Sequence, residues 1–341
     1  MYLFIRVDAN PNIGMGHFAR CLAVAEEAVK HGFLVAFLSR SQIVLEKAKS
    51  LNYQTLNLAE FDSLIDEIPS TTSYLQKKST SKTILFIDTY EVCEEYISAF
   101  ASTSKIVYLG SKQFSSNDIN LIINYSSVFD EDYYKSHCPQ AKTCLGIKYA
   151  PLRKEFWNKS TSEQFFNHIF ISSGGADDPN ITQSILETLN EDSFFSDYVF
   201  EVIIGPLNLH KNSLVSRYQN TPNINLRIDT PSVADIMSQC SFAISAGGTT
   251  LYELASKRVA TVSFAINAEQ EPDAQSFAHL KLALYAGSLK DLSKNELCKR
   301  ISEELKKLIN KKSLYTEIRK NQIDALPNSG TTRIIQYLIG L

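Results

Sequence analysis

The sequence has no apolar run approaching the ~18 residues that a membrane-spanning helix needs. Charged residues interrupt the first apolar segment at Arg6 and Asp8, so the N-terminal residues lack the pattern of a signal peptide. A formal net charge of -3 gives no support for bulk nucleic-acid binding. We therefore expect a cytoplasmic protein without a membrane span and without nucleic acid as a partner.

Cysteine pairs and cofactor motifs are also missing. The six cysteines form no CxxC pair and no Cys/His cluster with zinc spacing, which favours reduced thiols and no metal site. The apolar neighbours of Cys21 and Cys240 predict that both lie in the core. A nicotinamide site is disfavoured, because Gly14-Met15-Gly16 lacks the third glycine of GxGxxG and Ser39-Arg40 replace the acidic end of the second strand. We expect no cofactor.

Short apolar segments alternate with helical patterns along all 341 residues, which is typical of parallel βαβ units. The predicted strands are 2–5, 33–38, 83–87, 106–109 and 121–123 in the first half, and 168–172, 198–204, 226–228 and 242–245 in the second. A mixed, polar connection at 152–167 separates the two halves. The sequence therefore predicts an α/β protein with two Rossmann-like domains, 1–151 and 152–341, facing across a cleft that holds the ligand.

The turn Ile13-Gly14-Met15-Gly16-His17 is the clearest site signal in the first half. It joins the first strand to an amphipathic helix that begins near Phe18 and for which Gly32 is a plausible stop. Such a turn presents backbone N–H groups to a ligand, and its histidine exchanges a proton near neutral pH. The alternative is a glycine-rich turn whose histidine only caps the helix.

The turn Gly247-Gly248-Thr249-Thr250 is the best anion site of the second half, since it precedes a helix over 251–256. Glu253 then either accepts hydrogen bonds from ribose hydroxyls or closes a capping box with Thr250. A second glycine turn contains Gly174 and Gly175. Beyond it, Asp177 and Asp178 are more typical of a turn and helix cap than of cation ligands.

In combination and in order, these motifs resemble the UDP-2,4-diacetamido-2,4,6-trideoxy-β-L-altropyranose hydrolase family of pseudaminic acid biosynthesis. The resemblance covers Arg6 to about Arg333 and is carried by Arg6–Ala9, Ile13–Leu22, Asp88–Tyr90, Leu145–Arg153, Gly174–Asp177 and Ser245–Leu254. It implies a GT-B-type fold related to MurG-like glycosyltransferases, with the catalytic histidine in the N-terminal domain and UDP on the C-terminal domain. It also implies cleavage of the UDP-sugar to UDP and the free sugar.

The residues expected to act follow from the motifs and the resemblance together. His17 activates the water that attacks the anomeric carbon, and the 247–250 turn holds the diphosphate through the helix end without a metal. The expected substrate-binding residues are Arg6, Asp8, Gly14, Gly16, Arg20, Asp88, Tyr90, Tyr149, Arg153, Gly174, Gly175 and Gln270. The expected UDP-binding residues are Ser245, Gly247, Gly248, Thr249, Thr250 and Glu253. Of these, Arg6, Asp8 and Asp88 stand at strand ends, where they orient His17 or the sugar.

Two departures from the family's pattern concern the sugar. Gly110-Ser111 replace the Asp-Asp pair that usually follows the strand at 106–109, and Asn267-Ala268-Glu269-Gln270 replaces the usual Asn-Gln. The residues alone do not separate attack by water from attack by an acceptor hydroxyl. A GT-B glycosyltransferase and a catalytically inactive UDP-sugar-binding protein therefore remain as alternatives, and in each case we expect a monomer.

Overall fold

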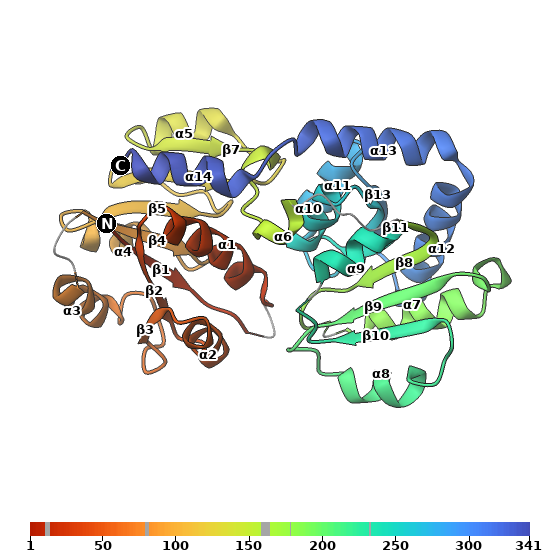
Figure 1. Cartoon of the computed structure of the whole chain (residues 1–341). Coiled ribbons are helices and arrows are strands. Elements are labelled where there is room, and N and C mark those ends of the chain that lie inside the picture. Colours follow the sequence, from red (N-terminus) through yellow and green to blue (C-terminus); the bar gives the residue numbers. More distant parts are fainter. Residues whose placement is uncertain (11–13, 79–81, 158–163, 178, 232) are drawn as a thin grey trace. The chain divides into compact units, whose positions relative to one another are not determined.

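The computed structural model describes residues 1–10, 14–78, 82–157, 164–177, 179–231 and 233–341. It divides into two compact units (Figure 1). The first unit contains residues 1–153 together with 328–341, and the second contains residues 154–327. Each unit is an α/β layer structure with its own parallel sheet.

The sheet of the first unit has the strand order β3-β2-β1-β4-β5-β6-β7, with every neighbouring pair parallel. Its strands are β1 (Tyr2–Val7), β2 (Leu34–Ser39), β3 (Gln54–Asn57), β4 (Thr83–Asp88), β5 (Lys105–Leu109), β6 (Ile119–Asn124) and β7 (Lys142–Leu145). Its helices are α1 (Gly16–Lys30), α2 (Gln42–Ser50), α3 (Ile68–Lys78), α4 (Glu94–Phe100), α5 (Glu131–His137), the 3-10 helix η1 (Ile147–Tyr149) and α14 (Gly330–Ile339). The order reverses at β1, which places β2 on one side and β4 on the other.

The second unit repeats this plan with the order β10-β9-β8-β11-β12-β13, again all parallel. Its strands are β8 (Phe165–Ser172), β9 (Val199–Ile204), β10 (Ile224–Ile228), β11 (Cys240–Ala246), β12 (Ala260–Ala265) and β13 (Leu284–Ser288). Its helices are α6 (Lys154–Trp157), α7 (Ile181–Asn190), η2 (Ser193–Phe195), α8 (Lys211–Tyr218), α9 (Val233–Gln239), α10 (Thr249–Ser256), α11 (Glu271–His279), α12 (Lys294–Asn310) and α13 (Lys312–Ala325). Here the order reverses at β8.

The central strands are mostly apolar and buried, because helices cover both of their faces. All six residues of β4 and all seven of β11 are buried. Cys21 and Cys240 lie in the cores, as the sequence predicts, and burial raises the pKa of both thiols. The nine predicted strands are all present. The structure adds β3, β7, β12 and β13, and β8 begins at Phe165, inside the segment expected to be a connection.

The C-terminal helix corrects the expected domain division. Residues 328–341 were expected to belong to the second domain, but α14 packs on α1 and η1 of the first unit (Figure 1). Its apolar face, Ile334, Ile335 and Leu338, is buried there, and the Thr331 hydroxyl donates to the Leu152 carbonyl at 2.8 Å. An amphipathic helix at a chain end packs wherever a complementary apolar face is available, so sequence order alone did not assign it.

The start of α14 fits so closely that only glycine is accommodated there. A Cβ added to Gly330 would lie 2.7 Å from the backbone nitrogen of Ala150 and 2.7 Å from the carbonyl carbon of Tyr149. We predict that Gly330→Ala lowers the free energy of unfolding by roughly 1–3 kcal/mol, because backbone atoms cannot move aside cheaply. Urea unfolding of the full chain measures this change.

Gly340→Ala is the matched control at the other end of the same helix, where the added Cβ would meet its nearest neighbour at 3.6 Å, an ordinary contact. This variant should be neutral or slightly stabilising. Equal losses of stability in the two variants would show that close packing of the α14 start is not the cause.

Candidate functional site

The candidate site of the first unit lies where β1 and β4 end. Because the strand order reverses at β1, the loops after these two neighbouring strands diverge and leave a crevice at their carboxyl ends. Asp8 directly follows β1, and Asp88 is the last residue of β4. His17 is the second residue of α1, the helix that follows β1. One crevice therefore brings together three residues that the sequence analysis selected.

Asp88 is the charged centre of this crevice. Its Oδ1 lies 2.7 Å from Nδ1 of His17 and also accepts from Nη2 of Arg20. Its Oδ2 accepts from Nε of Arg20 at 2.6 Å and from the Cys21 thiol at 3.3 Å. Each carboxylate oxygen thus has two donors. Burial by itself raises the pKa of Asp88, but the charge of Arg20 and the hydrogen bonds from Arg20 and His17 outweigh it and hold the pKa well below its usual range.

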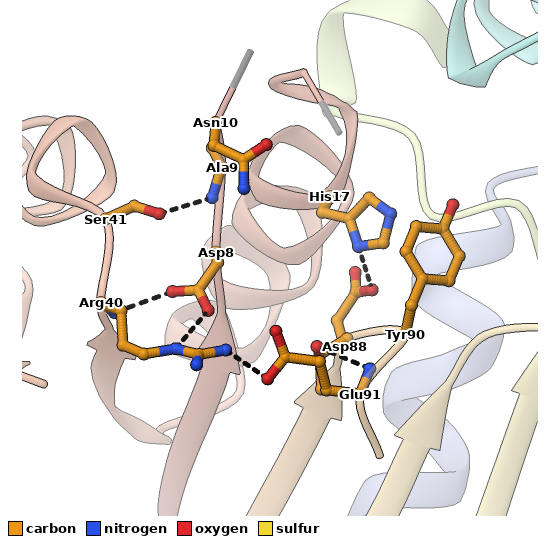
Figure 2. Close-up of a pocket in the computed structure, with 10 residues that line it drawn as sticks. Asp8, Ala9, Asn10, His17, Arg40, Ser41, Asp88, Tyr90 and Glu91 are labelled. Carbon is orange, nitrogen blue, oxygen red and sulfur yellow. Dashed lines mark hydrogen bonds and ion pairs between the residues drawn. The ribbon is translucent and has the colours of Figure 1, made fainter. Parts of the chain in front are cut away.

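The contact with Asp88 determines which nitrogen of His17 carries the proton. A carboxylate that is always ionised requires a donor, so Nδ1 of the neutral ring is protonated and Nε2 keeps its lone pair. Figure 2 shows Nδ1 pointing to Asp88 and the second nitrogen on the far side of the ring. The ring of Tyr90 packs edge-on against His17, with 4.8 Å between centroids. A neutral imidazole in this tautomer can accept a proton at Nε2, which is the chemistry that a general base requires.

Arg20 holds Asp88 and His17 in these positions. Besides its two bonds to Asp88, it donates from Nη1 to the Tyr125 hydroxyl at 2.8 Å. Its Nη2 lies 3.2 Å from Nδ1 of His17. Arg20 was expected to bind substrate. In the structure it does not line the pocket, and its described contacts serve Asp88, His17 and Tyr125.

Asp8 is held in the same way on the neighbouring strand. Its Oδ1 accepts from the Ser39 hydroxyl at 2.9 Å and from the Arg40 backbone at 2.7 Å. Its Oδ2 lies 2.7 Å from Nη1 of Arg6 and 3.3 Å from Nε of Arg40. Burial raises the pKa of Asp8, but Arg6 and the other donors together lower it. The carboxylate is therefore fixed in place and ionised.

The structure corrects the expectation for Arg6. Its side chain is completely buried, and the guanidinium makes two parallel bonds to Glu67, at 2.6 and 2.9 Å. The Tyr96 hydroxyl donates to the same carboxylate at 2.9 Å. A ligand has no access to this side chain, so Arg6 orients Asp8 and is not a substrate-binding residue. Nothing in the sequence marked Glu67, which lies 61 positions away, as its partner.

These side chains surround a pocket of about 530 Å³, a size that suits a small ligand (Figure 2). All the described lining residues belong to the first unit, and six of them were not selected as site residues from the sequence. The lining residues are Asp8, Ala9, Asn10, His17, Arg40, Ser41, Asp88, Thr89, Tyr90 and Glu91. Arg40, Ser41, Thr89 and Glu91 each follow the end of β2 or β4, so strand-end position was the signal that could have identified them.

The remaining predicted site residues of the first unit are not among the lining residues of the pocket. Gly14 has φ +68°, a conformation that glycine adopts without strain, and its N–H donates to the Asn10 carbonyl at 2.7 Å. Gly16 begins α1. Residues 11–13 of the same motif lie outside the described part of the chain. Tyr149 packs edge-on against Tyr337 of α14, and neither it nor Arg153, the last residue before the second unit, lines the pocket.

In the second unit the strand order reverses between β8 and β11, which is where a fold of this kind is expected to bind a ligand. Gly174 and Gly175 follow β8, and Gly247 and Gly248 follow β11. The backbone is packed tightly here, since a Cβ on Gly247 would lie 2.6 Å from the Gln270 carbonyl oxygen. The structure therefore brings the two glycine turns to neighbouring strand ends and places Gln270 against Gly247.

Helix α10 begins at Thr249, with Gly248 as its N-cap. The capping-box alternative for Glu253 is therefore wrong, because Thr250 is already inside the helix and cannot be its N-cap. Gly248, Thr249 and Thr250 are partly exposed at the helix N-terminus. Ser245, in contrast, is completely buried and donates to the Ala246 carbonyl at 3.0 Å, so it supports the turn from inside.

Asp177 caps a helix, as the sequence analysis favoured. Its carboxylate accepts from the backbone N–H of Ile181 at 2.8 Å and of Thr182 at 3.2 Å, at the start of α7. Asp178 lies outside the described residues. Over the described part of the chain, no three His, Cys, Asp or Glu side chains form a group suited to a metal ion. Among the same residues, no helix has both the length and the apolar character to cross a membrane.

Comparison with solved structures identifies the architecture. No protein-family model matches the chain. MurG of Acinetobacter baumannii superposes with a TM-score of 0.67 at 14% identity, over 100% of both chains. The spinosyn rhamnosyltransferase SpnG, in complex with thymidine diphosphate, gives 0.66 at 12% identity over 98% of this chain and 99% of that one. The chain has a GT-B fold.

Three curated proteins are similar in sequence at a lower level. MJ1062 of Methanocaldococcus jannaschii is 23% identical over 269 residues, which are 74% of this chain and 53% of that protein, so the chain spans about half of its length. SpsG of Bacillus subtilis, a spore coat polysaccharide biosynthesis protein, is 23% identical over 84% of each chain. The UDP-2,4-diacetamido-2,4,6-trideoxy-β-L-altropyranose hydrolase of Campylobacter jejuni is 24% identical over 74% of this chain and 87% of the hydrolase. The chain is a distant homologue of that hydrolase.

The buried pair of Asp88 and Arg20 yields a prediction about stability. Asp88→Asn leaves Arg20 without its counter-charge, and breaking a buried pair in this way costs about 3–5 kcal/mol. Because the pKa of Asp88 is depressed in the folded state, the stabilisation is complete above the unfolded pKa of about 4 and is lost as the pH falls further. Unfolding measured from pH 7 down to pH 3 should therefore show the gap between wild type and variant narrowing below about pH 4.

Asp132→Asn is the matched control, because the Asp132 side chain is 94% exposed. Its effect on unfolding should be close to zero at every pH. A gap between wild type and Asp88→Asn that stayed constant from pH 7 to pH 3 would contradict the depressed pKa of Asp88.

Proposed function

We propose that this protein hydrolyses a UDP-linked diacetamido-trideoxy sugar to UDP and the free sugar, in the biosynthesis of pseudaminic-acid-type sugars. The observation that carries the proposal is the His17–Asp88 pair, in which Nδ1 of His17 lies 2.7 Å from the carboxylate at the wall of a pocket of about 530 Å³. The name of the Campylobacter jejuni homologue supports the choice of substrate.

In the proposed reaction, Nε2 of His17 takes a proton from water as the water oxygen bonds to the anomeric carbon. The bond between that carbon and the β-phosphate oxygen breaks, and its electron pair leaves with UDP. The proton on His17 then passes to solvent, which restores the neutral ring. Asp88 is a positioning residue in this scheme, since it acts on His17 and not on the substrate.

We assign UDP to the second unit. The N-terminus of α10 offers unpaired backbone N–H groups and a partial positive charge, and Thr249 and Thr250 add hydroxyl donors. These groups stabilise the diphosphate as negative charge grows on the leaving oxygen. Glu253, one turn into α10, is assigned to the ribose hydroxyls. The thymidine diphosphate bound by the structurally similar rhamnosyltransferase supports a nucleoside diphosphate on this fold.

A GT-B glycosyltransferase is the second candidate, because the similar solved structures include glycosyltransferases. Such an enzyme would activate an acceptor hydroxyl at the same Nε2 in place of water. A sugar-nucleotide-binding protein without turnover is the third possibility. The three functions differ in a single observable, which is the release of UDP with and without an acceptor.

The central prediction is that the purified chain releases UDP from UDP-2,4-diacetamido-2,4,6-trideoxy-β-L-altropyranose in buffer alone. Release should persist in EDTA, because the helix N-terminus and not a metal ion holds the diphosphate. A panel of UDP-sugars, assayed by coupled detection of UDP, provides the comparison. Release only with an added acceptor would identify a transferase, and UDP binding without release would identify a binding protein.

The same assay tests His17. His17→Asn should lower kcat by about 10²-fold or more, the usual contribution of a general base, and should leave the Kd for UDP within a factor of two. The variant keeps a polar side chain on α1, and its melting temperature checks that the fold survives. Turnover close to that of the wild type would remove His17 from the mechanism.

A separate prediction concerns Glu253. If it accepts hydrogen bonds from the ribose, Glu253→Ala should weaken UDP binding about ten- to hundredfold, since hydrogen bonds to charged groups contribute roughly 1.5–3 kcal/mol. Calorimetric titration with UDP measures the change, and uridine is the second titrant because it carries the ribose without the phosphates. A lowered melting temperature with unchanged affinity for both would overturn the assignment.

A further inference from the structure

The two buried carboxylates of the pocket have little capacity left for a ligand. Each oxygen of Asp88 already has two close donor groups from the protein, and Asp8 accepts three hydrogen bonds from Ser39 and Arg40 and forms an ion pair with Arg6. A carboxylate has about four acceptor sites in total, so both groups are satisfied before a substrate arrives. Recognition of the sugar must therefore come from other groups on the pocket wall.

The pair Arg40–Glu91 is the charged group that retains free capacity. Arg40 follows β2 and Glu91 follows β4, the two strands on either side of β1, so the pair reaches across β1 next to Asp8 (Figure 2). Nη2 of Arg40 donates to Oε2 of Glu91 at 2.6 Å. Nη1 of Arg40 donates to the Asp62 carbonyl at 2.8 Å, which anchors the guanidinium from the other side.

The unused atoms of this pair stand next to each other. A guanidinium has five N–H groups, and the contacts to Asp8, Asp62 and Glu91 use three of them in Arg40. Oε1 of Glu91 accepts no hydrogen bond from any residue that the structure describes. The Glu91 side chain is 53% exposed and that of Arg40 is 16% exposed, so both are open to a ligand.

The unused N–H groups of Arg40 and the free Oε1 of Glu91 offer donors and an acceptor side by side. The carboxylates of the pocket lining give this part of the wall a negative charge. A phosphate is a poor match, because the described lining contains three carboxylates, of Asp8, Asp88 and Glu91, and one guanidinium, that of Arg40, which already pairs with two of them. A secondary amide is a good match, since it is neutral and its N–H and C=O are separate groups that bind an acceptor and a donor at once.

We propose that Arg40 and Glu91 recognise an N-acylamino group of the sugar, with Arg40 donating to the acyl carbonyl and Oε1 of Glu91 accepting the amide N–H. This inference rests on the proposed function for the identity of the substrate. On this inference, Arg40 and Glu91 cause the protein to bind N-acylated sugars more tightly than sugars with hydroxyls at the same positions, and His17 and Asp88 do not take part in that selection.

The test is the binding of two free sugars to the full chain in the presence of saturating UDP. One is 2,4-diacetamido-2,4,6-trideoxy-L-altropyranose, and the other is 6-deoxy-L-altrose, which has hydroxyls in place of both acetamido groups. Glu91→Ala should weaken binding of the diacetamido sugar about ten- to hundredfold, and Glu91→Gln, which keeps an acceptor oxygen, should weaken it less. Affinity for 6-deoxy-L-altrose should not change.

Glu317→Ala is the matched control, since Glu317 is 43% exposed and bonds Lys281 at 2.6 Å but belongs to α13 of the second unit and is not among the lining residues of the pocket. It should leave both affinities unchanged. Equal binding of the diacetamido sugar by wild type and Glu91→Ala, or no binding to the wild type, overturns the inference. Release of UDP by the wild type is measured separately. If the wild type releases no UDP but Glu91→Ala still weakens binding of the diacetamido sugar, the proposed function is wrong and the role of Arg40 and Glu91 in recognition is supported.

Discussion

The buried carboxylate of Asp88 is the group on which the candidate site depends. An ionised group that is completely buried is stable only when it is paired, and Arg20 and His17 supply the pairing. The same contacts fix the His17 ring, choose its tautomer and leave Nε2 for the pocket. Under the proposed function, a single electrostatic requirement of folding therefore also positions the general base, without a separate interaction devoted to catalysis. Asp8 repeats the pattern one strand away, held by Arg6 and Arg40.

The sheets of the two units share the same strand order, but the residues at their strand ends differ in chemistry. In each sheet the strand order reverses at the first strand of the unit, and a ligand site is expected at the neighbouring strand ends there. In the first unit charged side chains line the crevice, and the Arg40–Glu91 pair among them suits a neutral, hydrogen-bonding ligand. In the second unit glycines and threonines follow the strand ends at the start of α10, where backbone N–H groups suit an anion. The proposed function assigns the sugar and the nucleotide accordingly.

Local patterns predicted much of this structure, and long-range pairing accounts for what they missed. The apolar strands and the glycine turn before His17 are visible over a few residues, and the nine predicted strands are present. β3 and β7 were missed because they are short edge strands with polar residues. Arg6 was assigned to substrate because its burial depends on Glu67, which no nearby motif indicates. Arg40 and Glu91 were missed for the same reason, since their pairing exists only once β2 and β4 flank β1.

The most direct test of this account is the protonation state of the two nitrogens of His17. Long-range ¹H–¹⁵N correlation spectra of the histidine-labelled chain at neutral pH report it, and the spectrum of His17→Gln identifies the His17 signals. The account predicts a protonated Nδ1 and an unprotonated Nε2, because Asp88 requires a donor. A proton on Nε2, with or without one on Nδ1, would contradict it, since the base would then have no lone pair facing the pocket.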